Sequence, residues 1–369
     1  MHRPCLNPAV ASLASIAALA STSLAQSPPP GRDFDWATIT HPGNLSFPGN
    51  LNNPKWQGTW EGRGRVDYTY RIAKGEVSTA QWTEFVNTFS TQSGFPTFLW
   101  GRHSFAEAWG VWWGADPDPT YQGPGTRWVY GDRGDWPVQQ ISWRDAALYC
   151  NWLHNGKSSD PSSLWDGAYD TSTWSTVGIG NWTVTDAVEH RPDARFWMPT
   201  LDEWMKAVFY DPNRYGAGHE GWWKYVNSSD SPPVPGLPGE PGATTSGGLP
   251  FNYPEPWGII SVPLGAYAGQ VSPWGLLDTG SGASEWLQDP VWSVVSPGRL
   301  LARRIGGSYA GDFAYLDNSQ AGWFENYYVW DFGLGTGARL ASAIPAPATL
   351  VILVSWGVLL ARPTRSGRR

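Results

Sequence analysis

Cysteine is nearly absent from this chain. Only two of the 369 residues are cysteines, Cys5 and Cys150. Cys5 lies in an apolar N-terminal stretch that reads as a cleavable leader, which leaves Cys150 as the one thiol of the remaining chain. A single thiol excludes an internal disulfide. Stability must therefore come from packing, with or without a bound metal.

Charge is also scarce, and the chain has no basic excess. Charged residues make up 15% of the sequence and the formal net charge is −7. Because nucleic-acid binding requires a basic surface, we expect no nucleic-acid partner. What the chain does contain is 43 glycines, 32 prolines and 26 tryptophans. The glycines and prolines indicate a loop-rich protein, and tryptophan suits both its core and surfaces that bind sugars or peptides.

The N-terminal sequence predicts export. A short basic start is followed by the apolar stretch "AVASLASIAALASTSLA", with small residues before Gln26. This pattern is typical of a secretory signal peptide over residues 1–25. Residues 26–55 are rich in proline, glycine and asparagine, which predicts a linker or an irregular N-terminal segment.

The C-terminal residues 343–369 predict sorting to the cell envelope. "IPAPATLVILVSWGVLLARPTRSGRR" joins a Pro-Ala-Pro turn, an apolar run and an arginine tail. This arrangement resembles the PEP-CTERM sorting signal, with Pro-Ala-Pro in place of Pro-Glu-Pro, and implies sorting machinery of the exosortase type. The alternative is a plain C-terminal membrane anchor. In both cases we expect the body of the protein in the bacterial envelope or outside the cell, with the anchor retained or removed.

Three helices and a strand are indicated between these ends. The residues "GRVDYTYRIA" alternate as a strand does. "STAQWTEFVNTF" predicts a helix that begins at Ser78 or Thr79. A second helix begins at the Ser142 cap, ends near Asn155-Gly156 and carries Cys150 on its apolar face as an inert buried thiol. A third helix begins at Thr200, where Glu203 completes a capping box.

Five segments in order resemble one family, the formylglycine-generating enzyme or sulfatase-modifying factor domain. They are "YRIAKGEVSTAQWTEFVN", "PVQQISWRDAALYCNWL", "FWMPTLDEWMKA", "VPLGAYAGQVSPWGLLDTGSGASEW" and "RRIGGSYAG" followed by "GTGARLA". The resemblance implies an α+β fold, C-type-lectin-like and loop-rich with little regular secondary structure, over residues 56–342.

The same resemblance weakens the case for catalysis. In active members, two cysteines shortly after the Gly-Gly-Ser turn bind copper and oxidise a sulfatase cysteine to formylglycine. The corresponding residues here are Gly311 and Leu316, whose side chains cannot bind copper. We therefore expect no catalytic residues and no copper. Ser308 and Tyr315 match the family's active-site serine and tyrosine, and with Trp323 they form a candidate pocket for a peptide, glycan or other exopolymer.

A calcium site is the metal site that the resemblance implies. The family loop that wraps calcium corresponds to residues 278–286. The side chains of Asp278 and Glu285 would supply hard oxygens, and the carbonyls of Ser281 and Ala283 would complete the shell. Such an ion would be structural. The alternative is a metal-free loop in which Glu285 is hydrogen-bonded to the backbone.

Two other functions stay open at this point. One is a formylglycine-generating-type oxidoreductase with an altered active site, and the other is a purely structural envelope protein. A sister branch of the family uses histidines on iron. The histidines outside the leader are His41, His103, His154, His190 and His219, and none forms the required motif.

Overall fold

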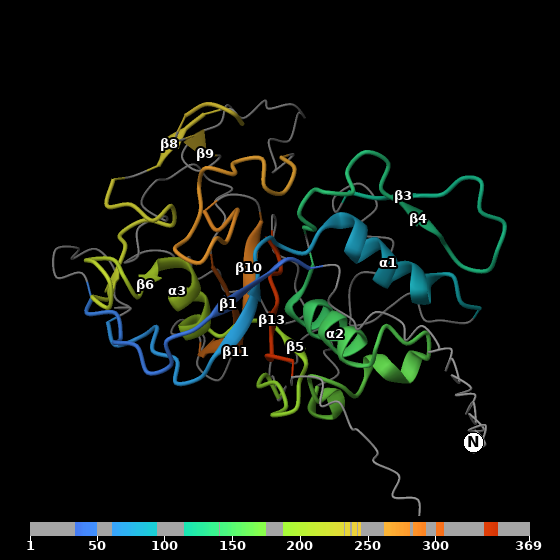
Figure 1. Ribbon diagram of the computed structural model, residues 1–369. Helices are drawn as coiled ribbons and strands as arrows, with labels where there is room; N and C mark the ends of the chain where they lie inside the picture. The colour runs from blue at the N-terminus through green and yellow to red at the C-terminus, as the bar shows by residue number, and fades with distance from the viewer. Residues whose placement is uncertain are drawn as a thin grey trace, which may run out of the picture.

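The computed structural model describes residues 34–49, 61–93, 114–139, 141–174, 187–231, 233–236, 238–241, 243–244, 262–280, 283–292, 300–305 and 336–345. Within these residues the protein is α+β, with three α-helices, short strands and long connections. Figure 1 shows the strands of the two larger sheets in the middle of the molecule, with α1 and α2 on one side and α3 on the other.

The larger sheets bring distant parts of the chain together. The first has the order β1-β2-β13-β5 and is antiparallel throughout, with strands β1 Trp36–Ile39, β2 Tyr70–Ala73, β5 Phe196–Trp197 and β13 Ala341–Ser342. The second has the order β11-β10-β12, with β10 Ser284–Trp292, β11 Leu300–Ile305 and β12 Thr336–Gly337. Strand β13 lies between β2 and β5, so the first and the last described segments of the chain contribute strands to the same sheet.

Short pairs of strands support the loops outside these sheets. They are β3 Asp116–Pro117 with β4 Trp128–Val129, β6 Tyr210–Asp211 with β7 Gly221–Trp222, and β8 Val234–Pro235 with β9 Ala243–Thr244. Two 3-10 turns, Pro161–Leu164 and Thr171–Thr173, follow α2. Side chains Asp160 and Asp170 cap these turns by accepting backbone N–H bonds.

The three helices begin where the sequence predicts. They are α1 Thr79–Ser90, α2 Trp143–His154 and α3 Leu201–Phe209, with N-caps Ser78, Ser142 and Thr200. All three have a complete capping box, in which the third helical residue also accepts the N-cap N–H. Helix α2 ends before Asn155 and Gly156, and the positive φ of 74° at Gly156 explains why glycine stands there.

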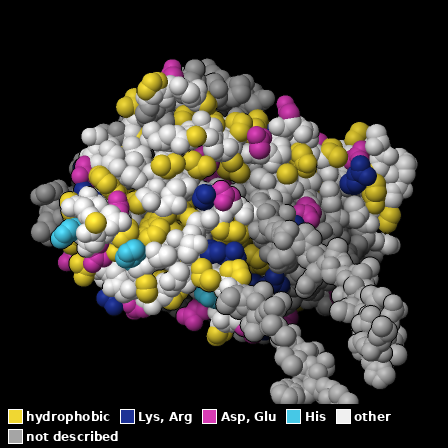
Figure 2. Space-filling model, in the orientation of Figure 1, with side chains coloured by type: hydrophobic (Ala, Val, Ile, Leu, Met, Phe, Trp, Pro, Cys, Tyr) yellow, Lys and Arg dark blue, Asp and Glu magenta, His cyan; other side chains and the backbone are white. Residues whose placement is uncertain are grey.

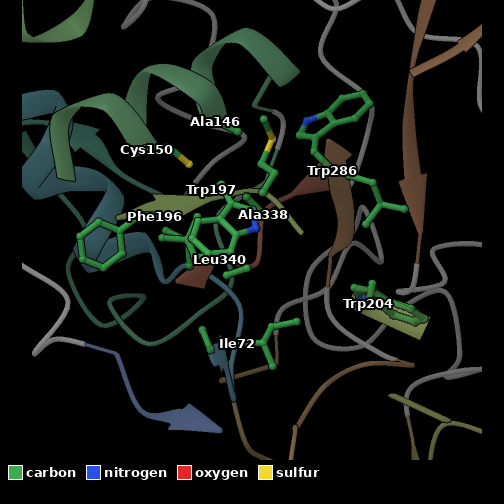
Figure 3. Close-up of a cluster of buried hydrophobic side chains, with 14 of the residues drawn as sticks. Ile72, Ala146, Cys150, Phe196, Trp197, Trp204, Trp286, Ala338 and Leu340 are labelled. Carbon is green, nitrogen blue, oxygen red and sulfur yellow. The ribbon is translucent and has the colours of Figure 1, made fainter. Parts of the chain in front are cut away.

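Aromatic side chains fill the core between these elements. Among the described residues, five tryptophans are fully buried: Trp82, Trp143, Trp152, Trp204 and Trp286. Where α1 meets α2, the rings of Trp82 and Phe85 lie 5.4 and 5.3 Å from that of Tyr149. Figure 3 shows the middle of this core, where α2, β5 and the segment before β13 meet. Burying side chains of this size is the main stabilising contribution that so loop-rich a protein has.

Two segments differ from the sequence expectations. Residues 36–39, in the expected linker or irregular segment, form β1 and pair with β2, because Ala37 and Ile39 alternate into the core. The strand expected over 64–73 is shorter at its start. Val66 and Arg63 instead accept backbone bonds from Gly43 and Phe47, so this stretch holds the loop after β1.

The surface charge and the helices of the described residues relate to the expectations about nucleic-acid binding and the membrane anchor. On the face shown in Figure 2, Lys and Arg side chains lie in small groups among Asp and Glu, without a broad basic patch. No helix among the described residues is long and apolar enough to cross a membrane. Residues 1–25 and 346–369, which carry most of the expected export and sorting signals, lie outside them.

Candidate functional site

A cluster of buried charged side chains includes two residues of the loop 278–286, for which the family resemblance implies a calcium ion. It consists of Glu76 before α1, Asp278 in the loop before β10, Glu285 in β10 and Arg339 before β13. Each comes from a different segment, and each is at most 6% exposed. The cluster sets three carboxyl groups against one guanidinium.

Arg339 and Glu285 satisfy each other. The arginine Nε donates to Oε1 of Glu285 at 2.8 Å, and its Nη2 lies 2.7 Å from the same oxygen. Nη1 donates to the carbonyls of Ala73 and Lys74, and Nη2 donates to that of Leu277, so each of the three guanidinium nitrogens has an acceptor. The second oxygen of Glu285 accepts a bond from the indole of Trp204. A buried pair with every polar atom bonded fixes the geometry of this region.

Glu76 and Asp278 are less well satisfied. Glu76 accepts one bond, from the Ala283 N–H at 3.2 Å, and its Oε1 has no hydrogen-bond partner within the described part of the chain. Burial, followed by the nearby charge of Glu285, raises the pKa of Glu76 well above its usual range. Burial also raises the pKa of Asp278, whose Oδ2 accepts the Gly265 N–H at 2.7 Å. Asp278 has a φ of 60°, in the left-handed region, so this loop turns sharply.

These contacts bear on the expected calcium ligands. Asp278, Ala283 and Glu285 lie around Glu76 as a group, while Ser281 lies outside the described residues. Among the described residues, no three His, Cys, Asp or Glu side chains, these three carboxyl groups included, are arranged so that they could hold a metal ion. The carboxyl groups of Glu76 and Asp278 have the oxygen chemistry that calcium prefers, whereas both oxygens of Glu285 are already engaged. The expected ligand set therefore fits in part.

Glu76, Arg339 and Trp204 were not identified as site residues from the sequence. Glu76 stands beside Val77 in "GEVS", and Arg339 stands between Ala338 and Leu340 in "GARL"; these apolar neighbours are buried. An isolated charge in an apolar context is a signal of a buried pair. The partner of such a charge cannot be read from spacing.

Cys150 lies in the core, as expected. It is fully buried on α2, and Figure 3 shows it beside β5 and its residues Phe196 and Trp197. Burial raises the pKa of the thiol far above its usual range. A thiol of this kind is neither a nucleophile nor a ready metal ligand.

The described histidines do not form a metal site. The ring of His190 stacks on Trp197 at 4.5 Å, and His154 accepts the backbone N–H of Arg195. His41 packs near Trp274 and His219 belongs to the turn before β7. His103 lies outside the described residues.

The candidate ligand pocket cannot be described in the same way. Ser308, Tyr315 and Trp323, together with Gly311 and Leu316, lie outside the described residues. The structure does place the strand that leads to them. Strand β11 ends at Ile305, which pairs with Glu285 of the buried charge cluster, and Ile305 directly precedes Gly306 in the sequence.

The sequence profile of the sulfatase-modifying factor enzyme 1-like domain, the FGE-sulfatase family, matches residues 60–343. The chain belongs to this family. The loop-rich α+β fold expected from the resemblance is thereby confirmed for the domain. The charge cluster, Cys150 and the candidate pocket all lie within the sulfatase-modifying factor domain.

Solved structures similar to this sulfatase-modifying factor protein include three proteins of low sequence identity. CarF is 20% identical, with 85% of this chain and 99% of that chain covered and a TM-score of 0.46. The variable protein 1 of Treponema denticola is 14% identical, with 84% and 95% covered and a TM-score of 0.38. PvdO from Pseudomonas aeruginosa is 12% identical, with 83% and 100% covered and a TM-score of 0.40. No curated protein matches the chain.

Proposed function

We propose that this sulfatase-modifying factor family member is an exported, envelope-associated protein that binds a peptide or glycan and does not catalyse oxidation. The observation that carries the proposal is its cysteine content. Of the two cysteines in the chain, Cys150 is buried in the core. The positions that follow the Gly-Gly-Ser turn hold Gly311 and Leu316. Copper(I) requires soft ligands, and this region of the chain offers no pair of thiolates.

The role of the remaining pocket residues follows from this loss. Ser308, Tyr315 and Trp323 keep hydroxyl groups and an aromatic ring, which bind ligands without redox chemistry. The signal peptide and the PEP-CTERM-like segment would bring this pocket to the cell surface, where peptides and exopolymers are available. The proposed partners are therefore the exosortase-type sorting machinery and an external ligand.

Copper loading tests the proposal. The purified protein is loaded with copper(I), its metal content is measured, and oxygen consumption is followed with a cysteine-containing sulfatase-type peptide. We expect neither stoichiometric copper nor turnover. The double variant Gly311→Cys/Leu316→Cys is the matched control, because it restores the two thiols and should bind copper. Stoichiometric copper and oxygen consumption in the unaltered protein would establish the altered oxidoreductase instead.

A structural calcium ion is a second part of the proposal. It is supported by the excess of buried carboxyl groups and by the unpartnered Oε1 of Glu76. A chelator should lower the melting temperature, and Asp278→Ala should abolish that sensitivity. Asp170→Ala, which removes an exposed cap elsewhere, should leave it intact. A melting temperature that the chelator does not change would contradict a calcium site.

A further inference from the structure

We propose that a surface pocket between the segment after β1 and the β6–β7 hairpin binds a neutral saccharide. The pocket has a volume of about 420 Å³ and is formed by residues 45–49 on one side and residues between 214 and 230 on the other. In Figure 1 the blue segment after β1 runs beside the yellow-green loops around β6. The volume falls in the range of small-ligand sites and suits a short saccharide.

Tyr215 provides an aromatic platform at the rim. Its side chain is 67% exposed, although it is large and partly apolar. The ring lies against Gly221, where an added Cβ would come within 2.6 Å of it, and the Arg214 guanidinium lies 4.9 Å from its centroid. The Tyr215 N–H also donates to the carbonyl of His219 at 3.0 Å. The ring is therefore held in position while much of its surface faces solvent.

The deeper wall of the pocket is aromatic. Phe47 and Trp222 meet edge to face, with centroids 5.6 Å apart, and both are buried. Trp222 packs against Gly64, where a Cβ would approach its ring to 2.2 Å. Such close packing keeps the wall rigid, so the pocket is formed before a ligand arrives.

Charged groups of both signs border these aromatic surfaces. The acids are Glu220 and Asp230, and the bases are Arg214 and Lys224. Arg214 Nη2 contacts both oxygens of Asp230, at 2.7 and 2.5 Å, and Asp230 is still 58% exposed. Glu220 is held by the hydroxyl of Tyr210 and by the N–H of Leu45. The lining therefore offers fixed donors and acceptors without net charge.

This combination favours a sugar over other ligands. A sugar hydroxyl both donates and accepts, so it can use carboxylates and cations side by side. The C–H face of a sugar ring matches an aromatic surface such as Tyr215. An apolar peptide side chain would desolvate the four charged groups without replacing their bonds. A strongly charged ligand would be repelled by half of them.

The proposal is independent of the Gly-Gly-Ser region. None of its residues belongs to the stretch that holds Ser308, Tyr315 and Trp323. Loss of either proposed site by mutation therefore leaves the other one testable.

Saturation-transfer NMR on the purified protein tests this pocket, with maltose, cellobiose and N,N′-diacetylchitobiose as probes and tri-alanine as the peptide probe. We expect at least one disaccharide to bind and Tyr215→Ala to weaken its binding about tenfold or more. Tyr215→Phe keeps the ring and should retain binding. The matched control is Tyr130→Ala, because Tyr130 is also exposed and lies against a glycine, Gly134, but lines a different pocket.

The possible results separate cleanly. Disaccharide binding that is lost in Tyr215→Ala and kept in Tyr215→Phe and Tyr130→Ala supports the proposal. Binding that Tyr215→Ala leaves unchanged overturns it, as does the absence of binding by all three disaccharides. Binding of tri-alanine alone would assign the pocket to a peptide and would also overturn it. Thermal unfolding of each variant shows that the comparison is made between folded proteins.

Discussion

Arg339 and Glu285 form an ion pair inside the protein, with the arginine Nη2 2.7 Å from the glutamate Oε1. The two side chains are 0% and 1% exposed. Glu285 lies in β10 and Arg339 precedes β13, so the pair joins the two larger sheets. Its contacts with the Ala73 and Leu277 carbonyls tie two further segments to the same point.

Removing one partner of this pair should strongly destabilise the protein. Arg339→Met leaves Glu285 and several carbonyls buried without donors, so we expect the free energy of unfolding to fall by about 3–5 kcal/mol. Urea denaturation measures the change. Arg65→Met breaks an exposed pair with Asp67, whose side chains are 50% and 69% exposed, and should cost less than about 1 kcal/mol. Equal losses in the two variants would show that the buried pair has no special role.

Alanine substitutions at two nearby glycines, Gly62 and Gly64, distinguish the cost of backbone strain from the cost of steric overlap. Gly64 and Gly62 have φ of 81° and 80°, so alanine at either position is strained by about 1–2 kcal/mol. A Cβ at Gly64 would also lie 2.2 Å from the Trp222 ring, whereas a Cβ at Gly62 meets nothing within 4 Å. We expect Gly64→Ala to be about 1–3 kcal/mol less stable than Gly62→Ala, measured by urea denaturation. Equal stabilities would mean that Trp222 moves aside without cost.

Asp145 should make stability depend on pH in the acid range. Burial raises its pKa from 3.8 to about 6, although the hydrogen bonds from Ser142 oppose this. The folded state therefore holds the proton more tightly than the unfolded state between these values. Its contribution to stability is greatest below about pH 4 and falls as the pH rises to 6, by about 3 kcal/mol in total.

Asp145→Asn tests this dependence, because asparagine cannot ionise and still offers an acceptor to the Ser142 N–H. Urea denaturation at pH 4, 5, 6 and 7 should show the variant gaining stability relative to the unaltered protein as the pH rises. Asp170→Asn is the opposite control. The bonds from Ser172 lower the pKa of Asp170, so its contribution is lost as the pH falls. Parallel curves for Asp145→Asn and the unaltered protein would refute the role of Asp145.

The sequence predicts those features that depend on neighbouring residues. Ser78, Ser142 and Thr200 predict the helix starts because an N-cap acts within one turn. The apolar faces of the helices likewise predict the burial of Trp82 and Cys150.

The charge cluster depends on pairing between distant segments. Glu76 is 263 positions from Arg339, and the two approach only because β13 pairs with β2. The family resemblance implies that the side chains of Asp278 and Glu285 both supply oxygens to calcium. In the structure Glu285 is bound by Arg339, and the unpartnered oxygen belongs to Glu76. Register between strands far apart in the chain is not encoded in local patterns, so this difference could not be read from the sequence.

Replacing Glu76 distinguishes a buried carboxyl group that holds a proton from one that binds a calcium ion. Burial and Glu285 raise its pKa well above the usual range, so without metal its ionisation lowers stability as the pH rises. Glu76→Gln removes that ionisation and keeps an acceptor for the Ala283 N–H. In the presence of a chelator, the variant should therefore become more stable than the unaltered protein between pH 5 and 8. Calcium should reverse this order, because only the carboxylate gains a cation to pair with.

Melting curves at several pH values, with chelator and with calcium, measure both effects. A variant that responds to calcium as the unaltered protein does would place any bound ion away from Glu76.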